Sequence, residues 1–180
     1  MGILRKNRPF FFFLLRFAVG YIVLSGLYWL YLSGFDAAQH EPDGMTYAVA
    51  RQSQLLIGSN ASIAPHPSEA SYRFFVHGKS VVRIVEGCNG ISVMILFAAF
   101  TIAFASTFKR TLVFTLGGII IIHILNIVRI ALLALGFYNY PQYSDLLHEV
   151  FFPLFIYGVV FGLWLLWVFK FSGYAAKAKN

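Results

Sequence analysis

Four long apolar runs indicate that this chain is a membrane protein. They cover about residues 10–32, 91–108, 111–136 and 150–169, and the run from Ile91 to Phe108 contains no charged residue. A helix needs about 20 apolar residues to cross a bilayer, so each run is long enough once its flanks are counted. The composition agrees, because 59% of the residues are hydrophobic and only 12% are charged, which is too apolar for a soluble domain. We therefore expect an all-α integral membrane protein with about four transmembrane helices, forming one membrane domain over residues 1–180.

The charges are divided between the two sides of these spans. With a cytoplasmic N-terminus, all seven acidic residues fall outside and the inner side carries only basic ones. Inner loops rich in Lys and Arg are the usual orientation signal. We therefore expect both termini and a tight Lys109-Arg110 turn to be cytoplasmic, and residues 33–87 to be extracytoplasmic. The inner basic residues are Arg5, Lys6, Arg8, Arg16, Lys109, Arg110, Lys170, Lys177 and Lys179.

This topology accounts for the formal net charge of +7. Basic residues at the inner face are attracted to anionic lipid. The lipid bilayer is therefore the expected partner of these charges, and they give no reason to expect nucleic-acid binding.

The extracytoplasmic segment contains the only expected β-structure. Ser71–Val76 and Ser80–Val85 are rich in aromatic and β-branched residues, and the His77-Gly78 step between them predicts a small hairpin. Thr46–Ile57 is expected to form a short helix that is capped by Thr46 and ends before Gly58. The second strand leads directly to Cys88, so the hairpin is expected to position that residue.

Cys88 is the only cysteine of the chain, and it lies between Gly87 and Asn89-Gly90 at the mouth of the second apolar run. Unpaired amides and the positive end of a helix dipole favour a thiolate at such a place. A lone cysteine in an apolar chain is more often an inert hydrophobic residue, so its position alone does not define a site. One cysteine also excludes a redox pair of the CxxC type.

The third span contains three polar residues, His123, Asn126 and Arg129. Ionisable groups inside a membrane helix are costly and usually face the protein interior or a water-filled cavity. Asn126 and Arg129 are three residues apart and share a helix face. Arg129 either has a functional role or pins helices together through backbone carbonyls or Glu149, whereas His123 is expected to have a packing or hydrogen-bonding role.

His148-Glu149 opens the fourth span, so Cys88, Arg129 and His148 all lie in the outer half of the expected membrane domain. A thiol nucleophile, an imidazole that accepts and returns a proton, and a fixed cation for an oxyanion form a set suited to acyl transfer. We expect the three side chains to bound one cleft, each within about 4 to 6 Å of another. The sequence after His148 lacks the second histidine of a zinc protease helix, so no metal site is expected.

Three segments together resemble the motifs of the exosortase and archaeosortase family of membrane transpeptidases, particularly its short, exosortase F-like members. They are Glu86-Gly87-Cys88-Asn89-Gly90, Asn126-Ile127-Val128-Arg129 and His148-Glu149, and they occur in the family's order. The resemblance covers roughly residues 81–160. It implies that Cys88 is the nucleophile, Arg129 the partner of the thiolate or oxyanion, and His148 the acid/base. Supporting roles fall to Asn126, Glu86, Asn89 and Glu149.

The resemblance also implies the substrate and the cellular location. Family members are expected to cut a C-terminal sorting signal, made of a short motif, a hydrophobic span and a basic tail, from exported proteins. The acyl group then passes to an acceptor nucleophile, without a cofactor, on the extracytoplasmic side of the bacterial inner membrane. Many members have about twice as many spans. Two other classes stay open, a non-catalytic membrane assembly subunit and a small transporter that uses Asn126 and Arg129 as its binding site.

Overall fold

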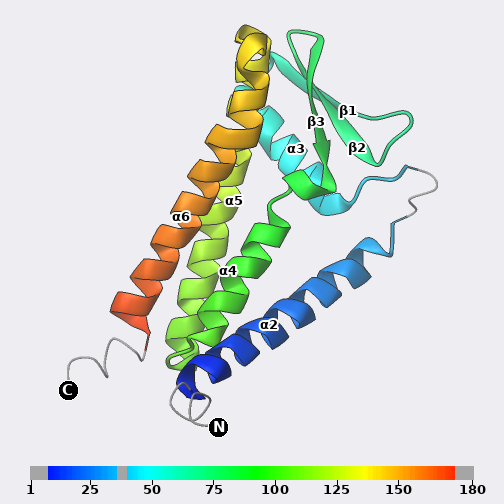
Figure 1. The fold of residues 1–180 in the computed structure, drawn as a ribbon. Coiled ribbons are helices and arrows are strands. Elements are labelled where there is room, and N and C mark those ends of the chain that lie inside the picture. Colours follow the sequence, from blue (N-terminus) through cyan, green and yellow to red (C-terminus); the bar gives the residue numbers. More distant parts are fainter. Residues whose placement is uncertain (1–7, 36–39, 173–180) are drawn as a thin grey trace.

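The computed structural model describes residues 8–35 and 40–172, and its helices form an elongated bundle with a small sheet at one end (Figure 1). Three helical segments are long and apolar enough to cross a membrane: Phe10–Leu32, Phe108–Asn139 and Leu146–Phe171. The first belongs to α2 (Arg8–Leu32) and the second is α5 (Phe108–Asn139). The third consists of α6 (Phe152–Leu166) flanked by π-helical turns at Leu146–Phe151 and Trp167–Phe171. The prediction of a mainly helical, multi-pass membrane protein is confirmed.

The second apolar run forms a shorter helix than predicted. Helix α4 (Ile91–Ala103) has 13 residues, so it rises about 20 Å and is shorter than the hydrocarbon core of about 30 Å. The chain leaves the helix at Phe104, and the Thr111 hydroxyl, which accepts from the Ser106 amide at 3.1 Å and donates to the Thr107 carbonyl, fixes the turn. Four full spans are therefore not observed among the described residues.

The predicted Lys109-Arg110 turn is also wrong. Both residues lie in the first turn of α5, which begins at Phe108 after Thr107 in an extended conformation. The connection between α4 and α5 is formed by residues 104–107 instead. This connection lies at the end of the molecule where α2 starts and α6 ends, opposite the sheet (Figure 1).

Helices α4 and α5 pack closely because one of them presents a bare backbone. A Cβ added at Gly118 would lie 2.2 Å from the Phe97 ring, and Phe97 is fully buried. On the same contact, the hydroxyls of Thr101 and Thr115 are hydrogen-bonded at 2.8 Å. Small residues and interhelical hydrogen bonds are the usual means of helix association in a bilayer.

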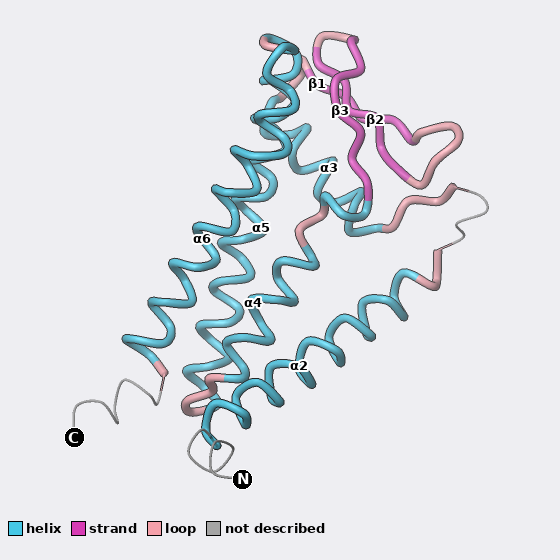
Figure 2. The backbone as a smooth tube through the Cα atoms, in the orientation of Figure 1, coloured by secondary structure: helices cyan, strands magenta, loops and turns pink. Residues whose placement is uncertain are grey.

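The sheet has three antiparallel strands in the order β1 (Ala61–Pro65), β2 (Ser71–Val76) and β3 (Lys79–Val85). The predicted hairpin is present as β2 and β3, and its turn residues His77 and Gly78 both have positive φ, 49° and 77°. Strand β1 is an addition that the sequence pattern did not predict. Figure 2 places all three strands at the same end of the molecule.

Helix α3 (Gly44–Ile57) lies between the sheet and α5 and completes a buried core with them. Val49 and Ala50 of α3, Phe74 of β2 and Ile130 of α5 belong to this core and are almost fully buried. The predicted helix is present and ends at Gly58, but its cap is Asp43 rather than Thr46. The Asp43 carboxylate accepts hydrogen bonds from the amides of residues 45 and 46, because an aspartate before the first turn satisfies amides that have no partner within the helix.

Candidate active site

The segment from Glu86 to Gly90 connects the sheet to α4 and carries Cys88. Residues Glu86–Cys88 form one 3₁₀ turn, and Gly90 then adopts a left-handed conformation with φ 82°. A Cβ at Gly90 would lie 3.1 Å from two atoms of the Asn126 side chain. Glycine is therefore required here both for its backbone conformation and for the close approach of the segment to α5.

Asn89 ties this segment to two further helices. Its Oδ1 accepts a hydrogen bond at 2.9 Å from the amide of Ile91, the first residue of α4, while its Nδ2 donates to the Tyr28 hydroxyl at 2.7 Å. The same Nδ2 lies 3.4 Å from the hydroxyl of Thr46, which itself donates to Asp43. Asn89, Thr46 and Asp43 are at most 4% exposed. Because buried polar groups are stable only when paired, this network fixes the cysteine segment against α2 and α3.

Glu86 contributes to the same network, since its carboxylate interacts with the hydroxyl of Tyr28. Sequence reasoning named Glu86 and Asn89 but missed Tyr28, Asp43 and Thr46 as their partners. A signal was present, because Asp43 followed by Thr46 has the spacing of a helix cap. Nothing in the sequence indicated that Tyr28, one of several aromatic residues in the first span, reaches the cysteine segment.

Asn126 links the backbone of Cys88 to the side chain of Arg129. Its Nδ2 donates to the Cys88 carbonyl oxygen at 2.9 Å, and its Oδ1 accepts from an Nη of Arg129 at 3.2 Å. Asn126 is only 2% exposed, so both bonds are shielded from water. One amide thus links the backbone of Cys88 to the side chain of Arg129.

Arg129 keeps an unused donor in this arrangement. Its buried Nε has no hydrogen-bond partner within residues 8–35 and 40–172. A buried guanidinium N–H without an acceptor is costly, so an oxygen atom supplied by a substrate would be stabilised there. The thiol of Cys88 is free and partly buried, and it packs against the core between the sheet, α3 and α5.

His148 lies apart from this pair. It is exposed in the π-helical turn Leu146–Phe151 and lines a groove of about 340 Å³ with Lys79, Phe137, Asp145 and Glu149, whereas Cys88 and Arg129 do not line it. Along α5, the rise from Asn126, which contacts Cys88, to Phe137 beside His148 is about 16 Å. This groove therefore does not bring His148 together with Cys88 and Arg129.

The remaining polar residue of α5 has a structural partner. His123 Nε2 lies 2.8 Å from the Gln52 side-chain oxygen of α3, which fits the packing or hydrogen-bonding role expected for it. In the described part of the chain, no group of three or more His, Cys, Asp or Glu side chains is placed to hold a metal ion.

These observations define a class: a multi-pass helical membrane protein in which a cysteine at a helix mouth is joined through an asparagine to an intramembrane arginine. The sequence model of the transmembrane exosortase family matches residues 11–170, and the chain belongs to that family. Comparisons with curated proteins and with solved structures gave no match.

Proposed function

We propose that this exosortase family member is a membrane-embedded cysteine transpeptidase that acts on C-terminal sorting signals of exported proteins. The observation that carries the proposal is the Asn126 amide, which binds the Cys88 carbonyl and the Arg129 guanidinium at once. A purely structural arginine would be expected to use all its buried donors within the protein, whereas Arg129 leaves Nε unpaired in the described part of the chain.

The proposed reaction begins at the Cys88 sulfur. The thiolate attacks the carbonyl carbon of the scissile peptide bond and forms a carbon–sulfur bond, while the carbonyl oxygen becomes an oxyanion. Donors of Arg129 stabilise that charge, because fixed donors in a water-poor site cost little to reorganise. The carbon–nitrogen bond then breaks, the leaving amine takes a proton, and the acyl group stays on Cys88 as a thioester. An acceptor nucleophile attacks the thioester, receives the acyl group and regenerates the thiol.

His148 has the chemistry to move these protons, but the groove that it lines does not include Cys88 or Arg129. A general acid/base must come within about 2.6–3.2 Å of the atom it protonates, directly or through one water. The role therefore requires a substrate-bound conformation in which the outer end of α6 approaches Cys88. The π-helical turn that carries His148 is the segment best suited to such a change, because π-turns are uncommon and often occur at functional sites.

The separation of His148 is also the observation that favours the second candidate function, a non-catalytic membrane assembly subunit. Such a subunit would need neither a reactive thiol nor a nearby base. The two functions differ in what Cys88 must do, so substitution of this residue distinguishes them.

We propose a topology in which the sheet and Cys88 lie on the extracytoplasmic side of the bacterial inner membrane and both termini are cytoplasmic. The charge asymmetry supports it, since no acidic residue occurs at the opposite end. In this arrangement α2, α5 and the segment Leu146–Phe171 cross the membrane fully. The short helix α4 crosses only its inner two thirds, which leaves Cys88 below the outer surface. Reporter fusions after residue 180 and near Gly58 should give opposite signals, and equal signals would contradict the topology.

The function is tested by co-expression with a candidate exported protein that ends in a motif, a hydrophobic span and a basic tail. Mass spectrometry of that protein should show tail removal with the wild type and none with Cys88→Ala. Ser92→Ala, at an exposed position one turn further into α4, is the matched control and should retain activity. Trimming by Cys88→Ala would exclude the transpeptidase and leave the assembly subunit.

Arg129→Lys refines the assignment of the cation. Lysine keeps the charge but loses the planar fork, so it cannot bond Asn126 and an oxyanion in the same geometry. We expect trimming to fall by about 10²-fold or more, the usual effect of losing an oxyanion donor. A mild effect would mean that charge alone suffices at this position.

A further inference from the structure

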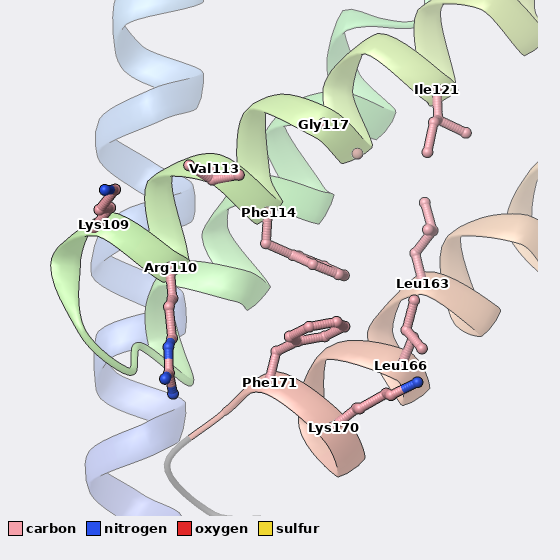
Figure 3. A pocket seen from close by; sticks show the side chains of 11 residues that line it. Lys109, Arg110, Val113, Phe114, Gly117, Ile121, Leu163, Leu166, Lys170 and Phe171 are labelled. Atoms are coloured by element: carbon pink, nitrogen blue, oxygen red, sulfur yellow. The ribbon is translucent and has the colours of Figure 1, made fainter.

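A second site lies at the opposite end of the bundle from Cys88. A groove of about 900 Å³ opens between the first turns of α5 and the last turns of α6, and three of its lining residues are basic: Lys109, Arg110 and Lys170. Figure 3 shows Phe114 and Phe171 facing each other inside it, with Gly117 leaving bare backbone on the α5 side. The two rings are 5.6 Å apart, and most of the remaining lining is aliphatic.

The charge at the mouth of this groove is not balanced by the protein. Lys109, Arg110 and Lys170 are all exposed and make no ion pair within residues 8–35 and 40–172. The sequence contains no acidic residue at positions 1–35 or 150–180. Membrane orientation explains why basic residues occur on this side, but it does not explain why they border an apolar groove.

The N-terminus of α5 adds to the unbalanced positive charge at the mouth of the groove. Lys109 and Arg110 are in its first turn, where no acidic residue is present and the Thr107 side chain forms no cap. Helix N-termini favour negative charge, so two cations at this position oppose the helix dipole. An external anion at the mouth of the groove would be attracted by both cations and by the dipole.

We propose that this groove binds one anionic two-chain phospholipid from the leaflet that borders the basic end. The phosphate lies among Lys109, Arg110 and Lys170, and an acyl chain lies along Phe114, Gly117 and Phe171. A groove that is apolar in its depth and basic only at its edge complements an amphiphile of this charge. A basic-tailed substrate helix would instead be repelled by the mouth.

The test uses the purified full-length protein in nanodiscs that contain equal amounts of phosphatidylglycerol and phosphatidylcholine with identical acyl chains. Native mass spectrometry then measures which lipid stays bound after release. Wild type should retain phosphatidylglycerol selectively. Substituting Lys109, Arg110 and Lys170 by Gln should lower the preference by about fivefold for each cation removed. Arg51→Gln with Lys79→Gln, both exposed near the sheet, is the control for the removal of positive charge away from the groove, and it is compared with Lys109→Gln combined with Lys170→Gln.

The apolar part of the groove is tested without changing charge. A Cβ at Gly117 or at Gly158 meets no atom within 4 Å, but only Gly117 lines the groove. Gly117→Leu should therefore reduce retention of the anionic lipid, whereas Gly158→Leu should leave it unchanged. A Cβ fits at both positions, and thermal unfolding of both variants shows whether a loss of binding comes from misfolding.

Three outcomes would overturn the proposal. The first is equal retention of the two lipids by the wild type. The second is equal behaviour of Gly117→Leu and Gly158→Leu. The third is a stable dimer without bound lipid, which would mean that a second copy of the chain covers the groove.

Discussion

Asn126 is the residue whose removal tests the site most directly. Asn126→Ala deletes the donor to the Cys88 carbonyl and the acceptor for Arg129 in one step. It also removes the side chain against which Gly90 packs, since Asn126 atoms lie 3.1 Å from a Cβ placed at that glycine. We expect a folded protein whose cysteine segment and guanidinium are no longer held together.

The expected loss of stability in Asn126→Ala follows from the two hydrogen bonds that it removes. Side-chain hydrogen bonds within membrane proteins contribute about 0.6 kcal/mol on average and up to about 1.7 kcal/mol each. Loss of both should therefore lower the free energy of unfolding by about 1–3 kcal/mol. The activity should fall further, by about 10²- to 10³-fold, because a misplaced oxyanion donor costs as much as an absent one.

Asn126→Asp separates the two bonds. A carboxylate still accepts from Arg129 but cannot donate to the Cys88 carbonyl, so the arginine stays paired while the cysteine segment is released. The carboxylate also neutralises the charge that the oxyanion needs. We expect the free energy of unfolding to fall by about 1 kcal/mol, for the one bond lost, together with a loss of trimming as large as that of Asn126→Ala.

The assay is the ratio of trimmed to full-length substrate in cells with matched enzyme levels, combined with unfolding of the purified protein. Asn139→Ala is the control, because Asn139 is an exposed asparagine of the same helix whose side chain donates to the Leu135 carbonyl at 2.8 Å. Wild-type trimming by Asn126→Ala would refute the reasoning, since the proposed coupling of cysteine and arginine would then have no effect on the reaction.

Two further predictions concern helix packing and the position of His148. Gly118→Ala should lower the free energy of unfolding by about 1–3 kcal/mol, as overpacking does, because its Cβ would lie 2.2 Å from the Phe97 ring. Gly117→Ala, whose Cβ meets nothing within 4 Å, should leave that free energy unchanged in the same assay. For the second, Cys88 is the only cysteine, so His148→Cys creates a protein with two. Gel analysis then measures which thiol cross-linkers of graded length join the two cysteines. Only long reagents should react without substrate, and short ones should react once a sorting peptide is bound. A length dependence that the peptide does not change would exclude His148 as the acid/base.

The sequence predicted the elements whose cause is local. The first span is set by its apolar length, and the hairpin turn by His77-Gly78, where both residues have positive φ. Strand β1 was missed because Ala61–Pro65 has few β-branched residues and ends in proline. It forms because β2 offers it a pairing edge and α3 covers it, and such contacts are not visible in local sequence.

Depth in the membrane was the least predictable property of the site. Chain order and sidedness placed Cys88, Arg129 and His148 on one side, and the spacing of Asn126 and Arg129 on one helix predicted their contact. The length of α5 beyond Asn126 could not be read from hydropathy, because the apolar pattern does not show where the bilayer ends. That length carries the start of the next helix, and His148 with it, away from Cys88.

The length of helix α4 limits which peptide bonds of a substrate can reach Cys88. In the proposed topology, with Ala103 at the inner boundary of a hydrocarbon core about 30 Å thick, the 13 residues of α4 rise about 20 Å and leave the thiol within about 10 Å of the outer boundary. An extended peptide covers that depth with about three residues. The bond to be cut must therefore lie within a few residues of its own hydrophobic span. Inserting a flexible spacer between the motif and the span of a substrate should abolish trimming once the spacer exceeds that length.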